Sequence, residues 1–566
     1  MKKMKSKYLF LVFLAFSFVS WYTPWLRTPY TYPPGDDPAF IILYAITTEE
    51  TSSLSSHPYY YPPGLSLILV ILHFFTDINY STLLIHLPLI TTFLFIPLGI
   101  YCFVKGMTKN IKIAFFCIFL WTISADPIWR MIRFGQNAEI IGLFLSILVF
   151  YVLLVHRKFI LALLLLIMTF LIHIIASLVS YSVLFVFIFI IFFEYLQTRN
   201  NMQFLFFKKS FFILIISLII IFKLWYFYYH LIKVSLTAAF HQYFSSMSII
   251  PLLSSIFLLS LVFVNKKQRI ILIFKKSIGI IAVSLAAISM GLPFFRSFIK
   301  DSIISILLNF LFNLSGYGSF LNKTLSILFL ILFPLAIWDG LKFRKNGKIV
   351  LFCFLWLSIL SLFMHLHLQP TPSRFLREFI FAQIIIIAVG FNYIFNYFRR
   401  NSHKLVSILL VLLLLITILS NAYPSFISKS LRTPKLVRIH DDEINAMNYI
   451  KLHSKPSDRI LCTPLSWIWV KVLTRRDTIP LGFNKNINAS DTNNLWYILN
   501  NPETEQAYNL AKKHNITYIY QGGRMPDVLY RWIHANETGL RKSKYFELVF
   551  TSSRVRIYKV KETIDN

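Results

Sequence analysis

Long apolar runs fill the first three quarters of the chain. From residue 8 to residue 423, these runs alternate with short polar or lysine-rich breaks. A membrane-spanning helix needs about 20 consecutive and mostly apolar residues. The pattern therefore predicts a polytopic α-helical membrane protein with about 13 transmembrane helices. The predicted spans are 8–23, 82–104, 111–125, 139–155, 159–172, 176–195, 210–227, 248–264, 277–295, 321–339, 348–364, 378–396 and 404–422.

The hydropathy pattern changes near residue 424. Residues 424–566 have an ordinary polar composition, with 22 Lys and Arg against 13 Asp and Glu, and this length is sufficient for one independent domain. We therefore expect a membrane domain at 1–423 and a small mixed α/β domain at 424–566. The elements predicted in the second domain are helices at 441–453 and 502–514, strands at 459–462 and 516–520, and a hairpin of 546–550 with 554–558.

The loop between the first two spans, residues 24–81, is unusually long. Residues 38–48 read as a short amphipathic helix at the membrane interface, with Pro38 suited to a first helical position. The apolar run at 64–77 is too short to span a bilayer, so it is predicted to be re-entrant or interfacial. Long ordered loops usually have a function.

Composition and charge agree with the membrane prediction and give it an orientation. The chain is 57% hydrophobic and 14% charged, with a mean hydropathy of +0.64 and a net charge of +32. Of the 34 basic residues before residue 424, 24 lie in breaks on the side of the N-terminus. Basic loops stay cytoplasmic, so the N-terminus is predicted inside and, after an odd number of spans, the C-terminal domain outside. Most of the net positive charge lies in the predicted cytoplasmic loops, where it is attracted to anionic membrane lipid, so nucleic acid is not an expected partner.

Other motifs support the same topology. Six Asn-x-Ser/Thr sequons all fall on the predicted outer side, beginning at Asn79, Asn313, Asn322, Asn488, Asn515 and Asn536. No small-residue cleavage site follows the first apolar run, so we expect it to be retained as a span. The four cysteines are scattered and predict neither a disulfide framework nor a zinc site. We expect a multi-pass cell-membrane protein, and the composition suits a prokaryote, including an archaeon.

The candidate chemistry begins at the outer end of the first span. There, Gly35-Asp36-Asp37-Pro38 presents two adjacent carboxylates, and a positioned carboxylate can serve as a general base. Asp37 precedes Pro38 directly, so its alternative role is to cap the helix that follows. Asp36 is then the freer group and the preferred base, with Asp37 as the second candidate.

Two arginine pairs are candidates for binding an anionic group near the outer boundary. Arg130 and Arg133, and likewise Arg374 and Arg377, are three residues apart and share one face if the segment is helical. The planar guanidinium suits phosphate. Snorkelling to the membrane surface, or an ion pair with Glu378, remains the alternative for each arginine.

Further polar side chains occur where apolar residues dominate. His173 divides an apolar stretch of nearly forty residues and is expected at an outer turn, facing a cavity or satisfied within the fold. Asp126 and Glu139 flank the same outer level. His365 and His367 have no carboxylate or cysteine at ligand spacing, so no metal site is assigned to them.

Together these features resemble the GT-C superfamily of membrane glycosyltransferases. It includes protein O-mannosyltransferases, lipid A aminoarabinose transferases and oligosaccharyltransferase catalytic subunits. The resemblance implies a catalytic or metal-binding carboxylate at Asp36 or Asp37, and a divalent metal is possible, with Asp126 and Glu139 as further ligands. Tyr61-Pro62-Pro63 is similar to the His-Pro-Pro of the mannosyltransferases, with Tyr61 in place of histidine. The Trp-Trp-Asp-Tyr-Gly motif of oligosaccharyltransferases is missing, and Ser466-Trp467-Ile468-Trp469 is a poor substitute.

The predicted function is therefore transfer of a sugar from a polyprenyl- or dolichyl-phosphate donor to a glycan, lipid or protein acceptor outside the membrane. Arg130, Arg133, Arg374 and Arg377 are the expected phosphate ligands, and Tyr61, Asp126, Glu139 and His173 are expected to line the substrate cavity. The alternative is a polytopic transporter or a flippase for lipid-linked saccharides. Transporters usually show internal repeats and charges near the membrane midplane, and this chain shows neither.

Overall fold

A computed structural model describes most of the first loop, several membrane helices and most of the C-terminal domain. The described residues are 10–19, 32–33, 37–51, 63–123, 136–173, 375–400, 439–462, 467–480, 489–522 and 536–563, with isolated positions at 8, 22, 176–216 and 329–357. Contacts divide the chain into two compact units. The first comprises Met1–Pro29, Leu87–Met131 and Ala138–Arg432, and the second comprises Tyr30–His86, Ile132–Asn137 and Thr433–Asn566.

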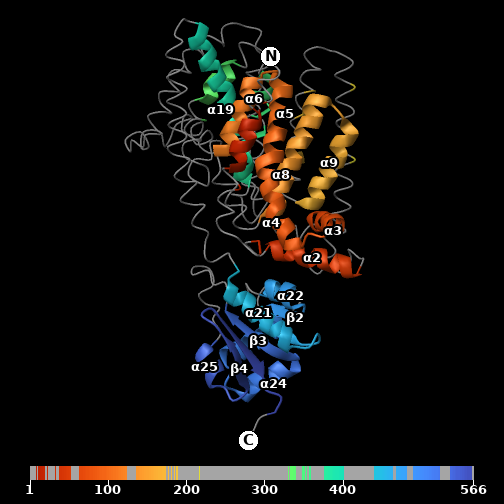
Figure 1. Cartoon of the computed structure of the whole chain (residues 1–566), viewed down its shortest axis with the longest axis vertical. Helices are drawn as coiled ribbons and strands as arrows, with labels where there is room; N and C mark the ends of the chain where they lie inside the picture. The colour runs from red at the N-terminus through yellow and green to blue at the C-terminus, as the bar shows by residue number, and fades with distance from the viewer. Residues whose placement is uncertain are drawn as a thin grey trace, which may run out of the picture. The chain divides into compact units, whose positions relative to one another are not determined.

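The first unit is helical throughout its described part. α5, α6 and α19 contact one another and lie side by side (Figure 1). The helices with defined bounds between residues 80 and 400 are α4 (Tyr80–Ile90), which begins in the second unit, η1 (Thr91–Phe95), α5 (Ile96–Thr108), α6 (Ile111–Ile123), α8 (Asn137–Phe150), η2 (Tyr151–His156), α9 (Phe159–Ile172) and α19 (Phe375–Arg400).

Three of the described helical stretches are long and apolar enough to cross a membrane. They are Tyr80–Thr108, Asn137–His156 and Ile380–Phe398, and they coincide with the spans predicted at 82–104, 139–155 and 378–396. The helices Phe10–Val19, Ile111–Thr122 and Phe159–Ile172 are apolar but shorter. Several other predicted spans fall wholly or largely outside the described residues, so the total of thirteen stays a prediction.

Aromatic rings and small residues pack the helices of this unit together. Phe150 lies edge-on to Trp356, with ring centroids 4.8 Å apart, and 5.9 Å from Phe103. Elsewhere, the buried hydroxyls of Ser146 and Ser180 are 2.8 Å apart. Such close approach needs a small residue, because a Cβ on Gly142 would clash with Ala176.

The second unit joins two helices of the first loop to the C-terminal α/β elements. The loop contributes α2 (Asp37–Thr51) and α3 (Gly64–Thr76). The C-terminal helices are α21 (Asp441–His453), α22 (Trp467–Thr474), α23 (Ala489–Asn500), α24 (Glu505–Lys513) and α25 (Glu537–Lys542). The strands are β1 (Arg459–Cys462), β2 (Asp477–Pro480), β3 (Ile516–Gly522), β4 (Phe546–Thr551) and β5 (Val555–Val560).

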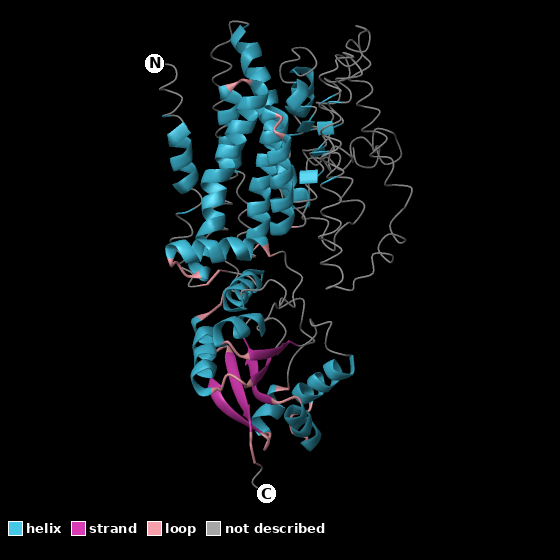
Figure 2. Cartoon of the chain, turned by 90° about the vertical axis from the view of Figure 1, so that its right-hand side faces the viewer, coloured by secondary structure: helices cyan, strands magenta, loops and turns pink. Residues whose placement is uncertain are grey.

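The strands form one mixed sheet in the order β2-β1-β3-β5-β4 (Figure 2). β1 is parallel to both β2 and β3, so each connection must cross over a face of the sheet. α22 provides the first crossover, and α23 with α24 provides the second. β5 is antiparallel to β3 and β4, which closes the sheet with a hairpin. One face of the sheet is covered by a core that includes Leu461, Ile519 and Tyr558.

The predicted mixed α/β fold of the C-terminal segment is confirmed. Helix 441–453 and strand 459–462 have the predicted bounds. The predicted strand at 516–520 and both hairpin strands are present with bounds that differ by one or two residues, and the helix predicted at 502–514 is present as the shorter α24. The sequence did not predict α22, β2, α23 or α25. α22 is rich in Trp, Ile and Val, which favour strands. Its local propensity therefore did not indicate a helix, and tertiary packing stabilises the helical form. The location of this domain outside the membrane stays a prediction.

Candidate functional site

The acidic pair of the first loop stands at the beginning of α2. Asp37 is the first residue of this helix, and Asp36 lies outside the described residues. All six residues from Ile41 to Ile46 are buried. A helix buried around its whole circumference is part of a core, so α2 is more enclosed than the expected amphipathic interfacial helix. The backbone that carries Asp37 is therefore held firmly.

α3 covers part of α2. Its hydroxyl-bearing residue Ser66 is buried and donates a hydrogen bond of 3.0 Å to the carbonyl oxygen of Ile41. Gly64, Leu65 and Leu69 are buried on the same helix. Because a buried hydroxyl needs a partner, this bond fixes one register between α2 and α3.

α22 of the C-terminal domain packs against α2. The rings of Phe40 and Trp467 meet edge-on with centroids 5.6 Å apart, and Tyr32 meets Trp469 at 5.7 Å. Both tryptophans are buried, and burial raises the pKa of the Tyr32 phenol above its ordinary value. Aromatic pairs of this geometry contribute about 0.5–1.5 kcal/mol beyond the burial of their area. The contact therefore joins the start of α2 to the start of α22.

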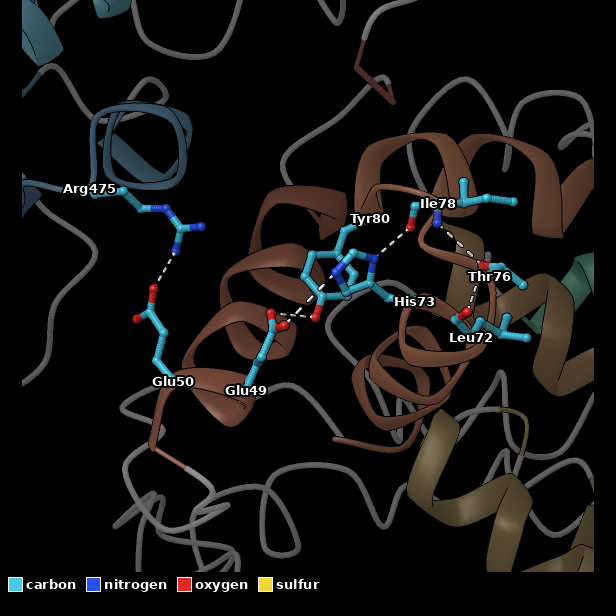
Figure 3. A network of polar contacts seen from close by, with 8 residues as sticks. All are labelled: Glu49, Glu50, Leu72, His73, Thr76, Ile78, Tyr80 and Arg475. Carbon is cyan, nitrogen blue, oxygen red and sulfur yellow. Dashed lines mark hydrogen bonds and ion pairs between the residues drawn. The ribbon is translucent and has the colours of Figure 1, made fainter.

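A second contact joins the ends of the same two helices. Arg475 caps α22 with a left-handed backbone (φ 59°), and its Nη1 is 3.1 Å from Oε1 of Glu50 in the last turn of α2 (Figure 3). The two contacts thus pair the start of α2 with the start of α22, and the end of α2 with the end of α22. The adjacent Arg476 donates to Ser454 and Lys451 on the end of α21, which anchors the α22 cap within the domain.

Glu49 connects α2 to the beginning of α4. Its Oε2 accepts a hydrogen bond of 2.8 Å from the Tyr80 hydroxyl, and its Oε1 is 3.9 Å from Nε2 of His73 (Figure 3). Carboxylates at a helix C-terminus are disfavoured by the helix dipole, by about 0.3–1 kcal/mol each. α2 ends with two of them and has no basic residue in its last turn. Arg475 and Tyr80 supply the compensation from outside the helix.

The turn between α3 and α4 is shaped by short-range bonds. Asp77 adopts a left-handed conformation (φ 55°) that ends α3. The Nδ1 of His73 is 2.9 Å from the carbonyl oxygen of Ile78 (Figure 3). Asn79 then accepts a hydrogen bond of 2.8 Å from the backbone N–H of Thr82, which caps the first turn of α4.

Glu139 and His173 lie in the first unit. Glu139 is fully buried in the first turn of α8, and His173 is buried at the C-cap of α9. Nδ1 of His173 accepts a 3.4 Å hydrogen bond from the backbone N–H of Ala176. A Cβ at Gly142, one turn after Glu139, would stand 3.4 Å from the Cβ of His173. The two predicted cavity residues therefore lie at the same end of neighbouring helices.

The other predicted site residues cannot be placed. Tyr61, Asp126, Arg130, Arg133 and Arg374 lie outside the described residues, and the structure describes Arg377 only as a backbone position near the start of α19. Within the described part of the chain, no group of three or more His, Cys, Asp or Glu side chains forms a metal cluster. Of the carboxylates that the resemblance offered to a metal, Asp36 and Asp126 lie outside the described residues, Asp37 is described only as a backbone position, and Glu139 is described in full.

Sequence reasoning did not identify the residues that hold α2. Trp467 was considered only as part of a substitute motif, and Arg475, Tyr80 and Glu49 were not singled out for any role. One available signal was the Glu49-Glu50 pair at the end of a helix with no basic residue, because such an arrangement requires cations or donors from elsewhere in the fold.

Comparison with solved structures finds a similar fold in two known glycosyltransferases. The oligosaccharyltransferase AglB from Archaeoglobus fulgidus, in complex with an inhibitory peptide and a dolichol-phosphate, matches 92% of this chain and 70% of its own, with a TM-score of 0.55 and 14% identity. The same enzyme tethered to an acceptor peptide containing the NVT sequon matches with a TM-score of 0.55. The arabinofuranosyltransferase AftD from Mycobacteria matches 100% of this chain and 40% of its own, with a TM-score of 0.56 and 11% identity.

These structural neighbours belong to the GT-C superfamily, so the resemblance inferred from the sequence is confirmed at the level of the fold. The chain has a mostly helical GT-C fold, with three described helices that are long and apolar enough to cross a membrane and with a small mixed sheet. No protein-family model matches the sequence, and no curated protein matches it significantly. At 11–14% identity the similarity is one of fold, and the chemistry has to be argued from this chain's own residues.

Proposed function

We propose that this protein is a membrane glycosyltransferase that moves a sugar from a polyprenyl-phosphate-linked donor to an acceptor on the outer face of the membrane. The observation that carries the proposal is the combination of a GT-C fold over more than nine tenths of the chain with an acidic pair at the start of a buried helix. The dolichol-phosphate bound in the AglB structure supports a lipid-phosphate donor.

The proposed reaction needs a base and a site for the leaving phosphate. A carboxylate of Asp36 or Asp37 accepts the proton of the acceptor nucleophile, which forms a new bond to the anomeric carbon. The bond from that carbon to the phosphate oxygen breaks, and the polyprenyl phosphate leaves with the electron pair. A positioned base contributes a factor of about 10² to 10⁴ in rate.

The position of the acidic pair suits this role. The N-terminus of a helix carries a partial positive charge, which favours an ionised carboxylate in the first turn or at the cap. Asp36 stays the preferred base, because a cap role is available to Asp37. An enclosed α2 also limits movement of the backbone that carries the base, which preserves its alignment with the acceptor.

The departing phosphate is assigned to cationic side chains. Arg130, Arg133, Arg374 and Arg377 are the candidates, because charge-assisted donors stabilise developing negative charge most strongly where water is excluded. Glu139 and His173, together with Tyr61 and Asp126, are assigned to the substrate cavity. The C-terminal domain is assigned to acceptor recognition, and the acceptor is a glycan, lipid or protein.

The test is a transfer assay in proteoliposomes with polyprenyl-phosphate sugars. Wild type is compared with Asp36→Asn and Asp37→Asn, and Asp77→Asn serves as a matched control from the same loop. We expect loss of at least about 100-fold in rate for the variant of the base. Movement of the intact lipid-linked sugar across the bilayer, without transfer, would support a flippase instead.

A further inference from the structure

The C-terminal domain contacts α2, the helix that begins at Asp37, near both of its ends. Phe40, one turn after Asp37, contacts Trp467, and Glu50, in the last turn of α2, contacts Arg475. Trp467 is the first residue of α22, a helix of only eight residues, and Arg475 is the residue that caps its end. A short helix that contacts α2 at two points ten residues apart restricts its tilt as well as its translation.

α22 is itself fixed in the domain. It directly connects the parallel strands β1 and β2, and Ile468, Trp469, Val470 and Thr474 are buried. At its end, Arg476 donates to the hydroxyl of Ser454 at 2.8 Å and to the carbonyl of the same residue at 2.7 Å. The position of α22 is therefore determined by the sheet and by α21. Through its contacts with α2, α22 in turn restricts the position of α2.

The two contacts differ in strength. The side chains of Arg475 and Glu50 are 43% and 63% exposed, so water screens their attraction. Trp467 is only 5% exposed, and its ring is surrounded by other side chains. The aromatic contact lies nearer to Asp37 and is shielded from water, so it determines the position of the start of α2, while the ion pair acts on the far end.

We propose that Trp467 is a positioning residue for the first-loop carboxylate, with Arg475 as its weaker partner at the other end of α2. This inference rests on the proposed function. It assigns to the C-terminal domain an indirect part in the chemical step, exerted through α2, in addition to acceptor recognition. Because small misplacements of reacting groups are costly, loss of the Trp467 ring is expected to lower kcat by about 10- to 100-fold.

The experiment compares Trp467→Ala with Trp467→Phe in the full-length protein in proteoliposomes. Trp496→Ala is the matched control, since Trp496 packs against the core formed by Leu461, Ile479 and Leu495 on α23 and the sheet. Two readouts are taken: kcat and KM for a polyprenyl-phosphate sugar, and hydrogen exchange of the backbone amides of residues 37–51.

In Trp467→Ala, the backbone amides of residues 37–51 should exchange faster and kcat should fall, while the KM for the donor stays within about threefold of wild type. Trp467→Phe retains an aromatic ring, so its kcat and its amide exchange in residues 37–51 should be close to those of wild type. Trp496→Ala should leave exchange in α2 unchanged. Faster exchange with an unchanged kcat would overturn the positioning role, and unchanged exchange in Trp467→Ala would overturn the contact itself.

The two proposals fail in different ways. A wild-type protein that transfers no sugar would refute the proposed function and with it a positioning role in catalysis. The exchange measurement would still decide whether α22 holds α2, because it needs no activity. An active wild type whose Trp467→Ala variant keeps full kcat refutes only the further inference.

Discussion

The guanidinium of Arg475 lies 3.1 Å from the carboxylate of Glu50, although the two residues are 425 positions apart in the sequence. The contact joins a helix of the first loop to a helix of the C-terminal domain. Next to it, Glu49 accepts a hydrogen bond from Tyr80 at the start of a membrane span. One end of α2 is therefore connected both to the C-terminal domain and to α4.

The Glu50–Arg475 pair predicts a graded response to charge changes. Arg475→Gln should lower the free energy of unfolding by no more than about 1 kcal/mol, because both side chains are substantially exposed. Arg475→Glu should lower the Tm further, since it places a third carboxylate beside Glu49 and Glu50. Exchanging the charges with Glu50→Arg in the same protein should restore part of the loss.

Thermal unfolding of the purified protein in detergent measures this series. Lys513→Gln, an exposed substitution on α24, is the control for a general effect of charge. Equal Tm values for Arg475→Gln and Arg475→Glu would contradict the contact, because a surface without neighbouring carboxylates would tolerate either residue.

The apolar face of α3 predicts contact with lipid. Ile71, Phe74 and Phe75 are 55%, 81% and 77% exposed, and the helix contains no Asp, Glu, Lys or Arg. Residues 74 and 75 precede the candidate span Tyr80–Thr108 by only a few positions, so we expect them at the membrane interface. Residues 64–77 were predicted to be either re-entrant or interfacial, and this exposure favours the interfacial alternative.

Cysteine accessibility tests this face. In a Cys102→Ser background in proteoliposomes, Phe74→Cys should react with a polar maleimide at least about 10-fold more slowly than Asp77→Cys, because the acyl region excludes the reagent. Equal rates of maleimide reaction at Phe74→Cys and Asp77→Cys would show that this face of α3 is in contact with water.

Gly142 is predicted to be intolerant of a side chain. A Cβ there would clash with Ala176, and the neighbouring Ser146 and Ser180 hydroxyls are already 2.8 Å apart. Gly142→Ala should destabilise the protein by about 1–3 kcal/mol through overpacking. Ser146→Ala removes a hydrogen bond without adding volume and should cost only about 0.6 kcal/mol. A larger loss of Tm for Ser146→Ala than for Gly142→Ala would contradict this packing.

Cys462 on β1 predicts a pH dependence of stability. The thiol is fully buried, and desolvation raises its pKa well above the ordinary value. In the unfolded chain a thiol ionises near about pH 8.5, so the unfolded state loses its proton first as the pH rises. The stability that this group contributes is complete below that pH and is lost above it, by up to about 1.4 kcal/mol per pH unit.

The comparison that isolates this effect uses Cys462→Ala. At about pH 7.5 the variant should be less stable than wild type, because it loses packing volume, and at about pH 10 the difference should shrink or reverse. Tyrosine ionisation affects both proteins alike and cancels. A difference in Tm that stays constant across this range would show that the thiol does not remain protonated in the fold.

The sequence was informative where local pattern and tertiary environment agree. Apolar runs predicted the helices at 82–104, 139–155 and 378–396, because a lipid environment demands one type of residue along a whole span. The strand at 459–462 was also predicted correctly, since it is short, apolar and bounded by polar residues. The superfamily resemblance was confirmed for the same reason, since it rested on the order of spans, loop and domain.

The missing elements and contacts depend on long-range packing. α22 has the composition of a strand and becomes a helix as the crossover between two parallel strands. The pairing of Phe40 with Trp467 joins residues more than 400 positions apart, and no local pattern encodes it. Similarly, α2 was expected to be half exposed, because the sequence around Ile41 does not reveal how many neighbours cover it.

If a carboxylate of the first loop is the base in glycosyl transfer, the rate of sugar transfer by Asp36→Asn and Asp37→Asn protein in proteoliposomes reports its role. We expect a loss of at least about 100-fold in kcat for one of the two variants, with Asp36→Asn the stronger, while Asp77→Asn transfers at the wild-type rate. Full activity in both Asp36→Asn and Asp37→Asn would contradict it.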